Sequence, residues 1–283
     1  PVIPNRFKDN AGSFAPPSDA NANKKVLNYI CSPDLFYYCT NGNDMQVNGV
    51  FFGSGRVNGV VGYDYLDYGL RGRIPPHLFY PISNATDLSY TFYCIPLLNP
   101  YKWNVTNRED GEFYSADTFS KLTKLISLSN MFYFCIIPAN INLPVDSYVN
   151  CIQLQDISSM FLSAQFESTS AMRQQVDGNL FSKNVNLRNI SYAFASGQST
   201  GDWSGRSPKK IDSTLFNVNK HKQLNNVTGL FYNAVSTVGS VPEFWTWLNA
   251  LSSNNRANVF YRMVKANLTN GASIPATWNN GMT

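Results

Sequence analysis

Charged residues are scarce in this chain. Asp, Glu, Lys and Arg make up 14% of its 283 residues, against about 25% in typical soluble domains. The net charge is only +4, and the densest basic cluster, Arg206 with Lys209 and Lys210, lies in a Gly/Ser-rich stretch that we interpret as a solvated loop. We therefore expect no nucleic-acid partner. A surface built largely from Asn, Ser, Thr and Tyr favours an extracellular or virion protein over a cytosolic enzyme.

Residues that perform catalysis are also few and scattered. The chain has two histidines, His77 and His221, and neither has a nucleophile or a second metal ligand at a useful spacing. Phosphate-binding glycine motifs are absent from the sequence. The carboxylates Glu109 and Asp110 lie in an insert and are interpreted as solvated, with a glycosidase pair kept as a weak alternative. We predict no enzymatic activity, no cofactor and no metal site.

Long hydrophobic runs are missing. The longest apolar run, Met131 to Ala139, has nine residues, far short of the ~20 that a membrane-spanning helix needs. No signal peptide is visible. Because the chain begins at Pro1 rather than at a methionine, we expect a processed product or a part of a longer protein.

The five cysteines form no C-x-x-C pair, and their number is odd. Cys94 and Cys135 fall next to or on a small-residue position of the repeat described below. This placement predicts that they are buried as small apolar residues. A disulfide between Cys31 and Cys39 is the alternative that we keep open for the first part of the chain.

Aromatic residues are abundant, with 19 Phe and 16 Tyr, and many belong to a recurring pattern. In the clearest copy, Val176 to Gly197, the pair Leu180–Phe181 leads to Ile190 ten positions after Leu180, and Phe194 follows four later. Five further copies share this pattern, and the first and last contain two extra residues. They are Leu35–Phe36 with Val47 and Phe51, Leu78–Phe79 with Leu88 and Phe92, Thr118–Phe119 with Leu128 and Phe132, Ser147–Tyr148 with Ile157 and Phe161, and Leu215–Phe216 with Val227 and Phe231.

A unit of this length cannot cover its own apolar residues, so its neighbours along the chain must do so. The pattern therefore predicts an α/β repeat solenoid of short strands and short helical turns, with about six irregular copies and the repeated Leu, Phe, Ile and Val residues as its core. An Asp or Asn precedes the late apolar residue in most copies, where a short polar side chain suits a turn or a helix cap. These residues are Asp87, Asp156, Asn189 and Asn226.

Three parts of the chain are distinguished by this pattern. Residues 1–24 are proline-rich and aperiodic, which is typical of an extended arm or linker. Residues 25–240 hold the repeats. Residues 241–283 are predicted to form a C-terminal helical cap and a polar tail, with helices at Pro242 to Leu251 and Ala257 to Ala266.

Three inserts follow the late phenylalanine of a copy: Gly53 to Arg73, Pro96 to Phe113, and Gly197 to Lys210. We expect them to emerge from one edge, where insertions often build a binding surface; neutral decoration is an equal alternative. Aromatic side chains in these inserts could contact a protein or stack on a sugar. The candidate ligand-binding residues are Trp103, Trp203, Tyr63 and Tyr65.

The segments TDLSYTFYC, LSNMFYFC, QDISSMFLSA, RNISYAF and NNVTGLFYNA resemble the BspA-like repeats of bacterial surface proteins. These repeats are related to leucine-rich repeats and occur in gut bacteria and their phages. The resemblance covers roughly residues 30–235, although the intervals here are irregular. It implies a solenoid used for surface contact or assembly, with no catalytic residues to carry over.

Three functions remain open, in order of preference. The first is a non-enzymatic protein-interaction or adhesion module, displayed on a bacterial cell surface or a virion, whose partner is another protein, a neighbouring subunit or a surface glycan. The second is a structural component of a tailed phage particle, such as a capsid, portal or tail decoration, locked to its neighbours by the proline-rich arm and the polar tail. The third and weakest is a carbohydrate-binding or carbohydrate-active protein.

Overall fold

The structure is a computed structural model that describes residues 35–36, 74–93, 114–137, 143–166, 175–196 and 207–283. The predicted arm, residues 1–24, lies outside the described residues. So do Cys31, Cys39 and Cys94, and nearly all of the three inserts.

The α/β repeat solenoid predicted from the sequence is wrong. The described residues contain no α-helix, and their longest helical element is the four-residue 3-10 turn η6. The strands are two residues long and pair only two at a time. The 3-10 turns are η3 (Tyr80–Ile82), η6 (Ala116–Phe119), η8 (Phe244–Thr246), η9 (Asn254–Arg256), η10 (Lys265–Asn267) and η11 (Gly271–Ser273), and the strands are β1 (Ile136–Ile137), β2 (Gln165–Phe166), β3 (Gln175–Val176) and β4 (Lys210–Ile211).

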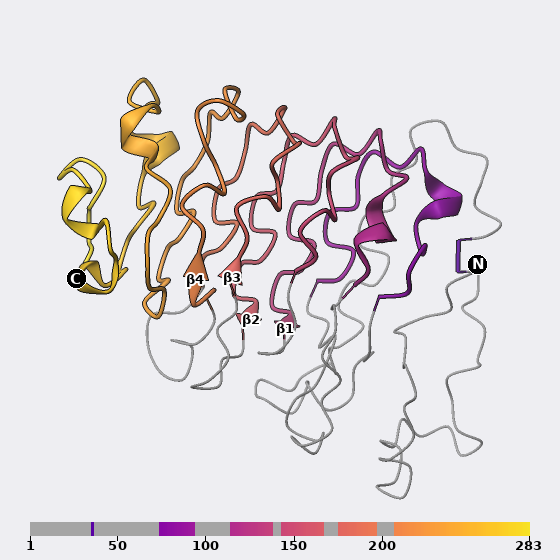
Figure 1. Ribbon diagram of the computed structural model, residues 1–283, viewed down its shortest axis with the longest axis horizontal. Helices are drawn as coiled ribbons and strands as arrows, with labels where there is room; N and C mark the ends of the chain where they lie inside the picture. Colours follow the sequence, from indigo (N-terminus) through magenta and orange to yellow (C-terminus); the bar gives the residue numbers. More distant parts are fainter. Residues whose placement is uncertain (1–34, 37–73, 94–113, 138–142, 167–174, 197–206) are drawn as a thin grey trace, which may run out of the picture.

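Successive copies of the pattern lie side by side in sequence order (Figure 1). Strand β1 pairs with β2 and β3 with β4, both in parallel. Single parallel bridges join the polar residue that precedes the late apolar position in each copy. This row of bridges runs through Asp87, Ser127, Asp156, Asn189 and Asn226.

Along the late half of each copy, backbone N–H groups donate in turn to the next copy and to a residue of their own copy. This alternation explains the lack of regular strands. The N–H groups of Ile190 and Phe194 donate to the next copy, at 3.0 Å to the carbonyls of Asn226 and Leu230. The N–H of Ala193 instead donates within its own copy, at 3.2 Å to Ile190. A strand directs its amides outward to its neighbours, whereas half of these amides close local turns.

Left-handed backbone conformations recur at the same place in each copy. The residue two positions before the late phenylalanine has a φ between 54° and 59° in six consecutive copies. Neither an α-helix nor an extended strand contains such a residue, so each one forces a turn. These residues are Tyr90, Asn130, Ser159, Tyr192, Gly229 and Asn258.

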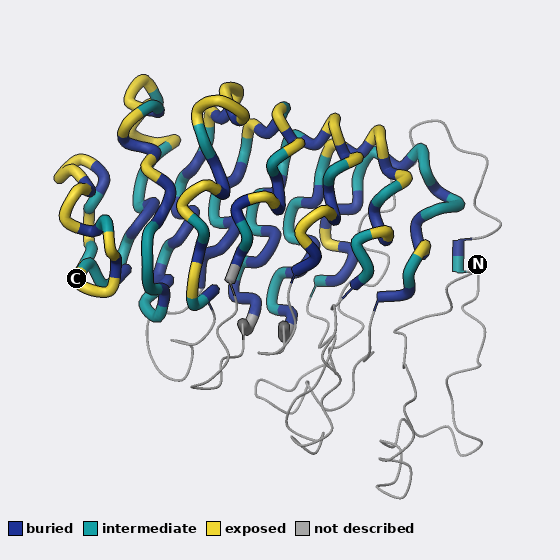
Figure 2. Tube along the Cα trace, in the orientation of Figure 1, coloured by how far each residue is buried: buried dark blue, intermediate teal, exposed yellow. Residues whose placement is uncertain are grey.

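Two columns of stacked rings fill the interior. The residues that are buried there belong to the dark-blue segments of the tube in Figure 2. Neighbouring centroids lie 5.4–6.2 Å apart in the late column and 5.1–6.4 Å apart in the early column, within the range of favourable ring pairs. All these rings are buried. The late column is Phe92, Phe132, Phe161, Phe194, Phe231 and Phe260, and the early column is Phe36, Phe79, Phe119, Tyr148, Phe181, Phe216, Phe244 and Trp278.

Apolar residues of the pattern pack beside these rings. Every predicted core residue of the second to sixth copies is buried, with an exposed fraction of 2% or less, whereas Phe36 of the first copy is 6% exposed. Val47 and Phe51 of the first copy lie outside the described residues. The aliphatic members are Leu78, Leu88, Leu128, Ile157, Leu180, Ile190, Leu215 and Val227.

The helical cap predicted for residues 241–283 is also wrong. Within the first predicted helix only Phe244–Thr246 is helical, and the second contains left-handed residues at Asn258 and Arg262. Phe244 and Trp278 instead extend the early column, and Phe260 extends the late one. The residues thus continue the ring stack rather than covering it with a helix face. Among the described residues, no helix has the length and hydrophobicity needed to cross a membrane.

Candidate ligand-binding pocket

The four ligand-binding residues proposed from the sequence, Trp103, Trp203, Tyr63 and Tyr65, all lie outside the described residues. Within the part of the chain that the structure does describe, no group of three or more His, Cys, Asp or Glu side chains is arranged to hold a metal ion. The reactive side chains of that part are two cysteines, the buried His221 and the exposed His77, and an open pocket lies near its C-terminal end.

Both cysteines, Cys135 and Cys151, are buried. The thiol of Cys135 donates to the carbonyl of Phe92 at 2.9 Å. Burial raises the pKa of the Cys151 thiol to about 12, so its reactive thiolate form is not populated at neutral pH. Both residues therefore belong to the packed interior, as predicted for Cys135.

His221 is buried inside the copy that contains Phe216. Its Nδ1 accepts the N–H of Asn217 at 3.2 Å, and its Nε2 lies 3.1 Å from the carbonyl oxygen of Phe181. The carbonyl requires a donor, so Nε2 carries the proton and the ring is neutral. Burial lowers the pKa of His221 below its usual value. The histidine thus serves as a hydrogen-bonding core residue that joins two copies.

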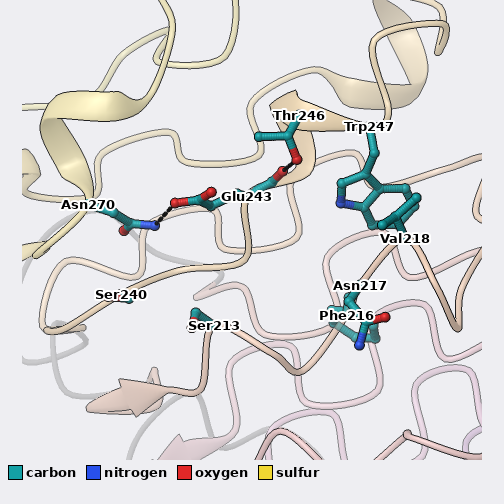
Figure 3. Close-up of a pocket in the computed structure, with 9 residues that line it drawn as sticks. All are labelled: Ser213, Phe216, Asn217, Val218, Ser240, Glu243, Thr246, Trp247 and Asn270. Atoms are coloured by element: carbon teal, nitrogen blue, oxygen red, sulfur yellow. Dashed lines mark hydrogen bonds between the residues drawn. The ribbon is translucent and has the colours of Figure 1, made fainter.

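An open pocket of about 290 Å³ lies between the last three passes of the chain (Figure 3). Its walls come from the stretch around Phe216, from the stretch around η8, and from the residue before η11. The lining residues are Ser213, Phe216, Asn217, Val218, Ser240, Glu243, Thr246, Trp247 and Asn270.

The pocket opens where the regular pattern is interrupted. The copy with Phe216 carries two extra residues, and Asn217 Oδ1 folds them into a turn by accepting the N–H groups of Asn219 and Lys220 at 3.1 and 3.2 Å. One copy earlier the packing is tight, because a Cβ added at Gly178 would collide with Thr214 Oγ1. The pocket therefore lies beside the copy that carries the two extra residues.

Glu243 is the acidic group of the pocket. Its Oε1 accepts a 3.3 Å hydrogen bond from Asn270 Nδ2. Asn270 is itself held by the backbone of Val241, whose N–H donates to Oδ1 at 3.1 Å and whose carbonyl accepts from Nδ2 at 2.9 Å. Thr246 Oγ1 donates to the Glu243 carbonyl at 2.7 Å. The Asn270 contact orients the exposed carboxylate, and within the described chain its Oε2 has no hydrogen-bond partner.

Two apolar side chains, Trp247 and Val218, line the pocket on the side away from Asn270, where the amide of Asn217 also lies (Figure 3). The Trp247 ring contacts Phe244 of the early column, with a centroid distance of 5.9 Å, and is half-buried. Val218 is 46% exposed. The pocket thus presents an indole and an aliphatic side chain together with a carboxylate.

The sequence contains one usable signal for this pocket, the two-residue insertion after Phe216. By its position in the expected cap, Trp247 is predicted to pack within a helix pair, and no sequence pattern distinguishes Glu243 or Asn270. Asn270 lies 27 residues from Glu243, so their contact depends on the side-by-side placement of the last two passes, which no local pattern predicts.

Comparisons with known proteins place the chain in no family. No protein-family model and no curated protein matches it. A weak structural similarity exists to a chain in the structure of the Toll–Spatzle complex, described as a molecular hub in Drosophila development and innate immunity. The identity is 12% and the TM-score 0.19, over 59% of this chain and 24% of that one. A similarity of this size carries no argument about fold or function.

Proposed function

We propose that the chain is a non-enzymatic binding module that works outside the cell, on a bacterial surface or on a virion. One observation carries this proposal. Cys151 and His221 are buried and used in packing, whereas Glu243 and Thr246 of the pocket are exposed and Trp247 is half-buried. Groups that are accessible but not activated suit recognition better than turnover.

The proposal is tested by measuring binding and turnover in parallel. The fluorescently labelled chain is titrated onto whole bacterial cells and onto their isolated envelopes, and the bound fraction is followed by flow cytometry. We expect saturable binding that a large excess of unlabelled chain removes. Turnover of a glycan or peptide panel that disappears in Glu243→Gln would contradict the proposal and identify an enzyme.

A structural role in a phage particle is the second candidate. The segment around Phe260, which extends the late column after the copy with Phe216, favours it. Its N–H groups at Asn258 and Phe260 have no acceptor among the described residues, whereas the equivalent amides of Gly229 and Phe231 donate to the next copy at 2.8 and 2.9 Å. Asn258 is only partly buried, and an edge amide without an acceptor can pair with another chain. Mass photometry separates the candidates: a defined closed oligomer supports the assembly role, and a monomer at micromolar concentration supports recognition.

A further inference from the structure

We propose that the pocket between Trp247 and Glu243 binds a neutral pyranose sugar, with the ring against the indole and hydroxyl groups on the carboxylate. This inference rests on the proposed binding function and names the ligand class of that same pocket. Three features support it: the polar wall, the apolar wall, and the charge and size of the space between them.

The polar wall suits paired hydroxyl groups. Glu243 accepts one hydrogen bond from Asn270 at 3.3 Å and keeps Oε2 free within the described chain. An ionised carboxylate accepts several hydrogen bonds, and those it accepts are stronger than bonds between neutral groups. Asn270 cannot turn away, because both of its amide atoms are bonded to the Val241 backbone. The Asn270 amide is therefore fixed, and it orients the exposed Glu243 carboxylate through one 3.3 Å hydrogen bond.

The apolar wall suits the opposite side of the same ligand. A pyranose ring has C–H groups on its faces and hydroxyl groups around its edge, so it needs an apolar surface and hydrogen-bonding groups at once. Trp247 and Val218 supply the first, across the pocket from Glu243 (Figure 3). An indole offers a large flat surface at a low cost in conformational entropy.

The charge and the volume of the pocket restrict the class of ligand further. The lining contains one carboxylate and no Lys, Arg or His, which disfavours acidic sugars and phosphates because like charges repel. Its volume of about 290 Å³ lies at the lower end of the ~300–1,000 Å³ typical of pockets for drug-sized ligands, which fits one or two sugar rings. A cationic amine would satisfy Glu243 but would leave the hydroxyl groups of Ser213 and Ser240 unused.

The test measures binding of the full chain to glucose, galactose, mannose and N-acetylglucosamine, both free and as polysaccharide ends. Calorimetry gives the affinity, and saturation-transfer NMR gives the sugar protons that touch the protein. We expect at least one neutral sugar to bind, and Trp247→Ala and Glu243→Gln each to weaken it by roughly tenfold or more, about 1.4 kcal/mol. Trp247→Phe retains most of the affinity because it keeps an aromatic face.

Two controls keep the result interpretable. Trp247 contacts the core, so Trp247→Ala could disturb folding; Glu243 is exposed, and Glu243→Gln tests the pocket without that risk. Asp146→Asn removes an exposed carboxylate outside the pocket and should leave sugar binding unchanged. The inference is overturned if no sugar binds, if both pocket variants bind as well as the parent, or if choline binds in place of sugar. Cell binding that persists without sugar binding would leave the proposed function standing.

Discussion

At the scale of single residues, the largest contributions to stability come from the stacked phenylalanines. Phe194 lies 5.5 Å from Phe161 and 6.2 Å from Phe231, and all three are buried. Replacing Phe194 by Ala leaves a gap inside a continuous column. We expect Phe194→Ala to lower the free energy of unfolding by about 3–5 kcal/mol, and Phe161→Ala to behave alike, as measured by urea denaturation.

A matched control is available on the surface of the same copy. Val185 is 47% exposed, so Val185→Ala should change the free energy of unfolding by less than about 0.5 kcal/mol. Losses below about 1 kcal/mol at both Phe161 and Phe194, against the ~3–5 kcal/mol of a filled core site, would mean that the column is not a packed interior.

His221 gives the molecule a pH-dependent stability. Its pKa is lowered in the folded chain by burial, whereas an unfolded histidine titrates near about 6.5. Below that pH the unfolded chain binds a proton that the folded chain does not, so stability falls as the pH drops from about 6.5 toward the folded pKa, by up to about 1.4 kcal/mol per pH unit. Above a pH of about 6.5 the contribution is complete.

The test compares the parent with His221→Asn on either side of the unfolded pKa, at a pH of about 7.5 and about 5.5, using urea denaturation. Asn is a suitable replacement because Asn184, at the comparable place one copy earlier, donates from Nδ2 to the carbonyls of Tyr148 and Cys151 at 2.9 Å. The difference between the two pH values should be smaller in the variant. An identical difference in both proteins would show that His221 does not titrate in this range.

At the scale of structural elements, the left-handed turn is what shapes each copy. The residue that adopts it is Tyr, Asn, Ser or Gly in different copies, so a positive φ is tolerated at this position without glycine. Gly229 is required for another reason: a Cβ there would collide with the ring of Tyr192 in the preceding copy. The close approach of two copies, and not backbone strain alone, selects the glycine.

The close contact at Gly229 predicts a specific coupling. Gly229→Ala should lower the free energy of unfolding by about 1–3 kcal/mol through overpacking. Adding Tyr192→Ala should recover part of that loss, because the colliding ring is gone. A double-mutant cycle measures the coupling, and strictly additive losses would refute the contact between the two residues.

The buried residues of this protein are easier to predict from its sequence than its fold class is. Spacing alone locates Phe132, Phe161 and Phe194, because burial of a repeated aromatic residue leaves a direct trace in the sequence. The turns leave none, since the left-handed position has no preferred residue type. The expected helix at Pro242 to Leu251 fails for a related reason. Its apolar residues contact different partners: Phe244 packs on Phe216, and Trp245 packs on Phe260.

The pocket cannot be predicted from the sequence because its residues are far apart along the chain. Glu243 and Asn270 meet only because two passes of the chain lie side by side, and the pocket beside Trp247 also takes residues from the copy before, such as Val218. Neither fact has a local signature. A two-residue insertion indicates that something changes after Phe216, but not that a cavity results.

At the scale of the whole molecule, hydrogen bonding between copies should set the pattern of hydrogen exchange. The amides of Phe132, Phe161 and Phe194 donate to the following copy at 2.8, 2.9 and 3.0 Å, and we expect them to be among the most protected. The amide of Phe260 has no acceptor within the described chain and should exchange faster, although its side chain is fully buried. Equal protection of Phe260 and Phe194 in a monomer would contradict this description of the last copy.

The rings of successive copies stay in contact although the copies differ in length, and the consequence concerns how such a chain can evolve. Successive late-column phenylalanines are separated by 40, 29, 33, 37 and 29 residues from Phe92 to Phe260, yet their centroids keep nearly the same spacing. Residues can thus be gained or lost between the anchoring positions without rebuilding the interior. Selection can then vary the exterior by changing length as well as by substitution. The copy with Phe216, which is two residues longer and contributes Val218 to the pocket, illustrates this.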